Sequence, residues 1–152
     1  MTMMMRAAAV AASTLLAAAP AWAAVSEQSP TPSEEAARFF GEGLAHQEAG
    51  RYEEAITAYR ASLRHDPRQA EALSNLGFCY KSLGRFQKAV GYYRDAIRLK
   101  PDLAEAHEYL GEAYIGLGKL DLARREYEIL TRLGSNEAEE LQEKLEAAES
   151  AE

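Results

Sequence analysis

The chain has 152 residues, and its 24 Asp and Glu outnumber its 17 Lys and Arg, which leaves a formal net charge of −7. This balance argues against a nucleic-acid-binding protein, because phosphate neutralisation needs a clustered surplus of Lys and Arg. The single cysteine, Cys79, excludes an intramolecular disulfide and a Cys-rich metal site. A polytopic membrane protein is excluded as well, because no apolar run of membrane-spanning length follows residue 25.

The first residues, MTMMMRAAAVAASTLLAAAPAWAAVS, have the features of a secretory signal peptide. Arg6 supplies a positive charge, an Ala-rich apolar stretch follows, and Ala21 and Ala23 are the small residues that a signal peptidase accepts. We therefore predict a signal peptide over residues 1–23, cleaved after Ala23, and a flexible leader over 24–32. The alternative is a retained membrane anchor, but the apolar stretch is short for a span and a proline follows it.

This Ala-rich segment resembles the export signals of Gram-negative bacteria, and the resemblance implies a periplasmic or secreted protein. No cysteine lies near the cleavage point to carry a lipid. Cleavage is therefore expected to leave no stable membrane anchor.

A period of 34 residues organises the rest of the chain. Each period contains two apolar helical patterns separated by a glycine, and no β-type alternation of useful length competes with them. We predict an all-α row of helical hairpins with helices over 36–49, 52–65, 70–83, 86–100, 104–117 and 120–133. The series that keep this step are Gly43, Gly77 and Gly111; Gly50, Gly84 and Gly118; Ala55, Ala89 and Ala123; Tyr59, Tyr93 and Tyr127; and Pro67 and Pro101.

The ends of the predicted helices are marked by local signals. Thr31 and Glu34 form a capping box with a proline at the first helical position, and we expect Asp102 and Asn136 to cap later helices in the same way. A left-handed glycine is expected to end the first helix of each hairpin, and a proline to stop the second. These terminators are Gly50, Gly84 and Gly118, and Pro67 and Pro101.

This pattern resembles the tetratricopeptide repeat (TPR) family, with repeats over 36–69, 70–103 and 104–137. The middle repeat meets the family signature throughout. The first repeat departs from it at Glu42 and His46, and the last at His107, Leu130 and Ser135. The resemblance implies an α-solenoid of three helix-turn-helix repeats that acts as a non-catalytic, protein-binding scaffold. The matching residues of the middle repeat are Leu73, Leu76, Gly77, Tyr80, Ala89, Tyr93, Ala96 and Pro101.

After the third repeat comes the acidic sequence NEAEELQEKLEAAESAE. Ala138, Leu141, Leu145 and Ala148 fall on one helical stripe, and acids cover the other faces. We predict a cap helix over 136–150, because the ends of a solenoid need a polar outer face, and a frayed acidic tail is the alternative. The folded domain would then span 33–152.

In the resembling family the concave side, lined by the first helix of each repeat, binds a peptide or protein segment. Apolar side chains stand beside four carboxylates among the positions that the resemblance implies here, and this suits a partner with apolar and basic side chains. The alternative is that these residues only pack the core or form a solvated helix face. The implied groove residues are Phe40, Leu44, Gln47, Glu71, Ser74, Asn75, Phe78, Lys81, Glu105, Glu108, Tyr109, Glu112 and Ile115.

One type of family member clamps a C-terminal carboxylate with Lys, Asn and Arg. The basic positions of that clamp fall on Phe40, Glu105 and Tyr109 in this sequence, and only Asn75 matches. A carboxylate placed among glutamates would be repelled, so we expect no binding of acidic chaperone tails.

Catalytic chemistry is not indicated. The sequence contains no H-x-x-x-H, phosphate-loop or G-x-S-x-G motif, and we expect neither a cofactor nor a metal. His46 and His107 occupy core positions of the repeat, and a buried, unreactive thiol is expected for Cys79, with a disulfide to a second chain as the alternative. The second functional hypothesis is self-assembly, in which Phe39 and Phe40 near the first edge contact another copy.

Overall fold

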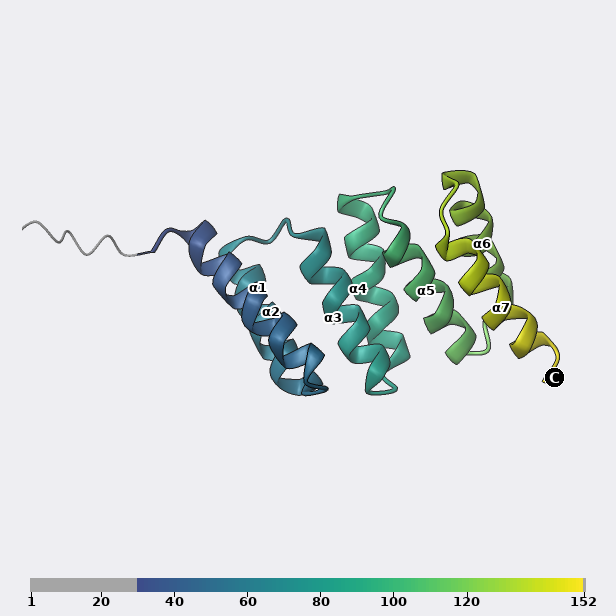
Figure 1. Ribbon diagram of the computed structural model, residues 1–152, viewed down its shortest axis with the longest axis horizontal. Helices are drawn as coiled ribbons and strands as arrows, with labels where there is room; N and C mark the ends of the chain where they lie inside the picture. The colour runs from purple at the N-terminus through teal and green to yellow at the C-terminus, as the bar shows by residue number, and fades with distance from the viewer. Residues whose placement is uncertain (1–29, 152) are drawn as a thin grey trace, which may run out of the picture.

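The computed structural model describes residues 30–151, in which seven α-helices follow one another along a row (Figure 1). This confirms the predicted all-α solenoid of three hairpins and a closing helix, and none of these helices is long and apolar enough to cross a membrane. The predicted signal peptide and most of the leader lie outside the described residues. The helices are α1 (Pro32–Glu48), α2 (Tyr52–His65), α3 (Ala70–Ser82), α4 (Phe86–Leu99), α5 (Ala104–Gly116), α6 (Leu120–Leu133) and α7 (Glu137–Glu149).

The start of α1 follows the predicted capping box. The Glu34 N–H donates to Thr31 Oγ1 over 3.2 Å, and the Thr31 N–H donates to Glu34 Oε2 over 2.7 Å. The expected caps at Asp102 and Asn136 are wrong. Leu103 is the N-cap of α5, and Asn136 already has helical backbone angles, so its side chain makes no capping bond.

The first helix of each hairpin ends at a left-handed glycine, as predicted. Gly84 has φ 72°, its N–H donates to the Lys81 carbonyl, and the Arg85 N–H donates to the Tyr80 carbonyl, each over 2.8 Å. This pair of bonds is the Schellman motif, which satisfies carbonyls at a helix end. The same left-handed geometry recurs at Gly50, Gly118 and Gly134.

A second set of glycines brings the helices of a hairpin together. A Cβ added to Gly77 would stand 2.6 Å from the ring of Tyr93, and one added to Gly43 would stand 2.5 Å from the ring of Tyr59. In the third hairpin Leu141 of α7 takes this place against Gly111, also at 2.5 Å. The closing helix therefore completes the packing of the third hairpin.

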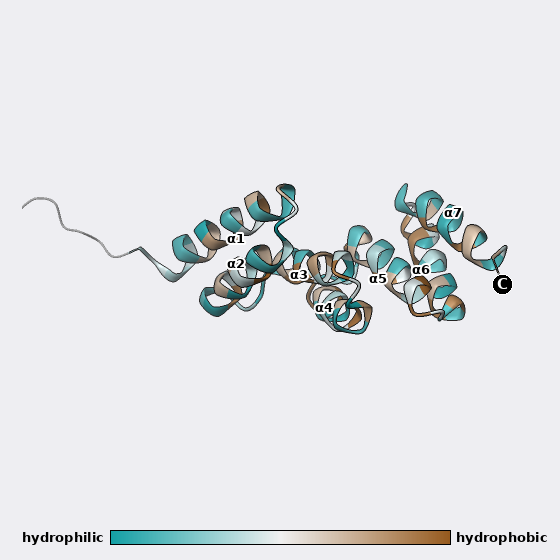
Figure 2. Ribbon diagram, turned by 90° about the horizontal axis from the view of Figure 1, so that it is seen from below, coloured by the Kyte–Doolittle hydropathy of each residue, from teal (hydrophilic) through white to brown (hydrophobic). Residues whose placement is uncertain are grey.

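The core runs through the middle of the row. α3 and α5 each bury seven residues, whereas α1 buries two and α7 three. Figure 2 shows hydrophobic and hydrophilic residues alternating along the helices from α1 to α7. Each hairpin thus depends on its neighbours to cover its apolar faces, as expected of a solenoid.

His107 is a buried polar residue within this core, at 4% exposure. Its Nδ1 lies 2.7 Å from Glu126 Oε2 and its Nε2 2.9 Å from the Pro101 carbonyl oxygen. Burial lowers the pKa of His107, but the bonds to Glu126 and Pro101 outweigh burial, and the pKa is raised above 6.5. Two acceptors therefore favour the doubly protonated ring.

We predict that replacing Gly77 by Ala lowers the free energy of unfolding by about 2 kcal/mol, because the buried Tyr93 ring leaves no room for a methyl group. Gly91→Ala is the matched control, since nothing lies within 4 Å of its Cβ position, and it should raise stability by about 0.5–1 kcal/mol. Urea denaturation measures both changes. Equal stability of the two variants would contradict the packing described here.

The pKa of His107 also predicts a pH dependence. A histidine whose pKa is raised on folding contributes its full stabilisation below the unfolded-state value, and that contribution is lost as the pH rises through the folded-state value. The free energy of unfolding should therefore decline above pH 6.5 by a component that His107→Gln removes. Urea denaturation across a pH series tests this, with His65→Gln at the exposed end of α2 as the control that keeps the decline.

Candidate functional site

The first helices of the hairpins form the inner side of the row. α3 packs on α5 and α5 packs on α7, whereas no comparable contact joins α2 to α4 or α4 to α6. α1 and α3 make no comparable contact either, so this closer approach joins α3, α5 and α7. α1, α3, α5 and α7 carry fourteen Asp and Glu against three Lys and Arg, while α2, α4 and α6 carry six against eight. The inner side is therefore acidic and the outer side is not.

Two aromatic rings from α3 and α5 lie at the centre of the inner side. The ring centroids of Phe78 and Tyr109 are 5.5 Å apart, with an interplanar angle of 53°. Lys81 Nζ lies 4.4 Å from the Tyr109 centroid and 5.3 Å from the Phe78 centroid, which is a cation–π arrangement. Both rings are only half-buried, so they keep apolar area that a ligand can cover.

Two lysines neutralise two of the carboxylates beside these rings. Glu112 is ion-paired with Lys81 and Lys144, and Lys144 Nζ also lies 3.1 Å from Glu108 Oε1. Burial raises the pKa of Glu112, but the hydrogen bonds from the two lysines outweigh burial, and its pKa is lowered. Burial also raises the pKa of Glu108, and there the bond from Lys144 does not outweigh it.

These side chains line a hollow of about 590 Å³ at α3, α5 and the start of α7. Asn136, Glu137 and Glu140 complete its wall. Five carboxylates and two ammonium groups therefore surround an apolar centre. Of the predicted groove residues, the hollow brings together Phe78, Lys81, Glu105, Glu108, Tyr109 and Glu112.

The predicted groove residues of α1 do not line this hollow. The Phe40 ring packs on Tyr59 with centroids 5.7 Å apart, and Leu44 is half-buried against the core. The Tyr59 hydroxyl donates to Gln47 Oε1 over 2.9 Å, and Cys79 Sγ lies 3.7 Å from the same oxygen. Phe40 and Gln47 thus pack on α2 within the first hairpin, and Gln47 also reaches Cys79 of the second.

The remaining predicted residues lie around the edge of the site. Glu71 is exposed, and its Oε1 lies 3.1 Å from Lys100 Nζ at the end of α4. Asn75 and Ile115 are half-buried on α3 and α5. Glu105 is exposed and has no ion pair among residues 30–151, so it is the predicted carboxylate with the most freedom to meet a partner.

Two predicted groove residues are covered. Ser74 is 2% and Glu108 5% exposed, because packing of neighbouring helices covers most of their surface, although Glu108 still lines the hollow. Within the described residues, Ser74 Oγ and the Tyr93 hydroxyl are buried without a hydrogen-bond partner. Each such hydroxyl costs stability, and both belong to the second hairpin, which supplies Phe78 to the aromatic centre.

Cys79 is fully buried, as predicted, and burial raises the pKa of its thiol to about 12. A protonated, inaccessible thiol is a poor nucleophile. Across residues 30–151, no three His, Cys, Asp or Glu side chains are grouped as metal ligands.

Sequence reasoning missed the contribution of α7 to the site. Lys144 pairs with two groove carboxylates, and Glu140 lines the hollow. The 34-residue period contained a signal for this role, because Ala138 follows Ala104 by 34 residues. The helix α7 therefore stands where the first helix of a fourth repeat would begin. Treating the segment only as a cap concealed this role.

The repeat model of one family matches the chain. The tetratricopeptide repeat model fits residues 40–104 and again residues 80–138, which together cover more than half of the sequence. The chain belongs to the TPR family. Comparison with curated proteins found no match.

Several solved TPR domains are similar to this chain. The first TPR domain of Spaghetti (RPAP3), bound to the HSP90 peptide SRMEEVD, is 28% identical with a TM-score of 0.70, over 77% of this chain and 95% of that one. The second TPR domain of human RPAP3, in complex with the HSP70 peptide SGPTIEEVD, is 26% identical with a TM-score of 0.71, over 76% and 98%. The Sgt2 TPR domain from Aspergillus fumigatus is 25% identical with a TM-score of 0.70, over 80% and 81%. Related TPR domains are thus peptide-binding interaction modules, and both of these peptides end in EEVD.

We predict that Lys144→Met lowers the free energy of unfolding by about 1 kcal/mol, because the buried Glu108 loses its ion-pair partner. Adding Glu108→Gln should recover part of this loss, since a neutral amide needs no counter-charge. Urea denaturation measures the variants, with Lys119→Met on the exposed turn before α6 as the control. A loss that Glu108→Gln leaves unchanged would show that the pair does not act as described.

Proposed function

We propose that this chain is a non-catalytic interaction module whose inner groove binds a protein or peptide segment with apolar and basic side chains. The observation that carries the proposal is the hollow around Phe78 and Tyr109, where half-buried rings are surrounded by an excess of carboxylates. Half-buried aromatic rings in a recess supply the apolar contact area that interfaces use as anchors.

The charge around the rings determines which segment fits. Lys81 and Lys144 are already engaged with Glu108 and Glu112, so the remaining carboxylates, above all Glu105, are left to attract a cation. A Lys or Arg beside an apolar side chain would place its charge among them while the apolar group covers the rings.

The same charges separate this groove from an EEVD-binding one. Two of the similar solved domains hold acidic EEVD peptides, whereas the inner helices here carry fourteen acidic residues against three basic ones. A peptide ending in several carboxylates would be repelled from this surface. The shared fold supports peptide binding in general, and the residues of this groove support a partner of opposite charge.

The location we propose is the periplasm. Its support is the composition of residues 1–23, with Arg6, an apolar Ala-rich stretch and the small residues before a cleavage point at Ala23. A scaffold that only holds a bound segment needs no cofactor. Such a protein can therefore act in the cell envelope as in any other compartment.

Self-assembly through the first edge has less support. Phe39 is half-buried, its ring stacks on His65 with centroids 5.6 Å apart, and the Arg38 guanidinium lies 4.0 Å from its centroid. The aromatic surface at this edge is thus partly covered by the same chain. Light scattering over a range of concentrations would reveal oligomers if a second copy did bind there.

We predict that charge reversal at two exposed groove positions, Glu105→Lys with Glu140→Lys, weakens binding of a labelled peptide in which Lys and Leu alternate by about tenfold or more. Fluorescence anisotropy measures the dissociation constant at fixed ionic strength. A peptide in which Glu and Leu alternate should bind this double variant more tightly than it binds the inner groove of the native chain.

The matched control is Glu54→Lys with Glu128→Lys, which makes the same change in net charge on the exposed faces of α2 and α6. It should leave the affinity for the Lys–Leu peptide within about twofold. Equal losses in the two double variants would show that only net charge matters, and the groove assignment would then be wrong.

A further inference from the structure

The outer side of the row carries two equivalent hollows, one repeat apart. The first, of about 500 Å³, lies between α2 and α4, and the second, of about 600 Å³, lies between α4 and α6. Arg60 and Tyr80 line the first, and the residues 34 positions later, Arg94 and Tyr114, line the second. The repeat therefore builds the same pairing of a cation with an aromatic wall twice on the face opposite the inner groove.

The first hollow has an aromatic wall with two cations beside it. The rings of Tyr80 and Tyr92 are stacked, with centroids 5.3 Å apart and an interplanar angle of 4°. Lys88 Nζ lies 5.4 Å from the Tyr80 centroid, and Arg60 stands on the same wall. The carboxylate at this hollow, Asp95, is already paired with Arg98 over 2.7 Å.

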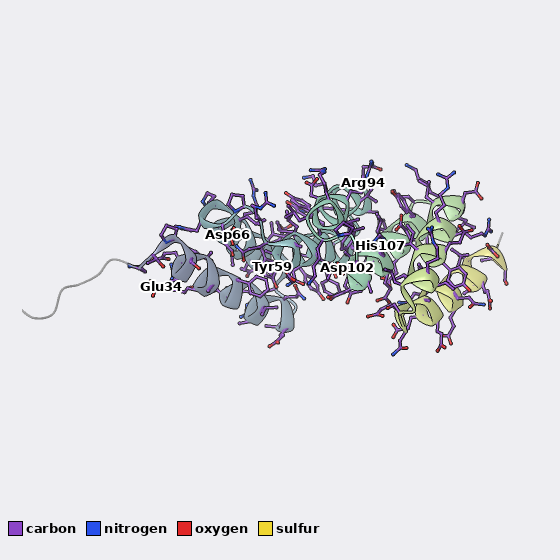
Figure 3. All side chains as sticks on the ribbon, turned by 90° about the horizontal axis from the view of Figure 1, so that it is seen from above. Glu34, Tyr59, Asp66, Arg94, Asp102 and His107 are labelled. Atoms are coloured by element: carbon purple, nitrogen blue, oxygen red, sulfur yellow. The ribbon has the colours of Figure 1, made fainter. Side chains whose placement is uncertain are left out.

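The second hollow keeps the arginine and one tyrosine of the first, but has Leu122 and Glu126 at the positions of Lys88 and Tyr92. Leu110 and Tyr114 are buried beneath it at 3% and 8% exposure, and Arg94 and Arg125 stand on its rim. Figure 3 shows Arg94 at the edge of the molecule, pointing away from the ribbon. The carboxylate here, Glu126, is bound to His107. Each hollow thus has its acid occupied, whereas Arg60 in the first and Arg94 and Arg125 in the second are outside the ion pairs of residues 30–151.

We propose that these two hollows form a second binding surface, which takes an acidic protein segment in which Glu or Asp alternates with apolar residues. Arg60, Arg94 and Arg125 form no ion pair within residues 30–151, so carboxylates of a partner would find them available. Apolar side chains between those carboxylates would enter the hollows and contact the half-buried Tyr92 in the first and Ile97 and Leu122 in the second.

The features of the surface favour a protein segment over the two other anionic occupants. A lipid surface binds helices that expose apolar residues for insertion, whereas the large exposed hydrophobic residue in the described region, Leu133, lines neither hollow. A second copy of the chain has an acidic helix in α7, but the apolar stripe of α7 is buried against its own chain at Leu141 and Leu145. The helix α7 therefore has no large apolar side chain left to enter the hollows.

The surface is tested with a fluorescein-labelled peptide in which Glu and Leu alternate, by anisotropy at low ionic strength. The double variant Arg60→Glu with Arg94→Glu, one change in each hollow, should bind this peptide about tenfold more weakly than the native chain. Arg132→Glu, the same change at an exposed position of α6 that lines neither hollow, should keep the affinity within about twofold. Circular dichroism confirms that the variants remain helical.

Three outcomes would overturn the proposal. The first is equal binding of the peptide by the native chain and the double variant. The second is displacement of the peptide by the Lys–Leu peptide at saturation, which would mean one site instead of two. The third is arginine-dependent binding to phosphatidylglycerol vesicles without binding of the peptide, which would assign the surface to lipid. The inner-groove variant Glu105→Lys with Glu140→Lys separates the two surfaces, because it should leave this affinity no lower than in the native chain.

Discussion

The structure depends on the contact between a helical glycine and a ring or branched side chain that lies directly on it. Gly77 has no Cβ, so the Tyr93 ring reaches the backbone of α3 and the two helices of the hairpin approach closely. Protein interiors are packed as densely as organic crystals, so a single methyl group at this point would overlap the Tyr93 ring. Close pairing fixes how the two helices of a hairpin lie against each other, and so which side chains face the inner side of the row and which the outer side.

The same contact explains why the chain needs α7. The third hairpin has its glycine, Gly111, but Leu141 of α7 covers it in place of the hairpin's own tyrosine. A helix recruited to complete the packing also brings polar groups to the inner side, and Lys144 pairs there with Glu108 and Glu112. The closing element and the candidate site are therefore parts of one structure, which is why the site lies toward the C-terminal half of the row.

Charge is divided between the two faces of the molecule. The net charge of −7 conceals an acidic inner side and an outer side on which basic residues exceed acidic ones. Within each face, the most buried carboxylates are neutralised by the chain's own cations, as Glu112 is by Lys81 and Glu126 is by His107. The unpaired charges that remain are negative on the inner side and positive on the outer side. The two faces therefore suit partners of opposite charge, which would bind without competing.

The sequence alone determined the helices, the hairpins and the row. The 34-residue period, the glycines at fixed places and the apolar stripe reflect contacts within one hairpin or between adjacent ones. Such local patterns can be recognised in the sequence without knowledge of the whole fold. Only the tertiary structure decided that Ser74 and Glu108 are covered, that Gln47 turns inward to Tyr59, and that Lys144 enters the groove. These outcomes depend on how far one helix is rotated against the next, and that rotation is set by the packing of all the side chains between them and not by the position of any one residue in the repeat.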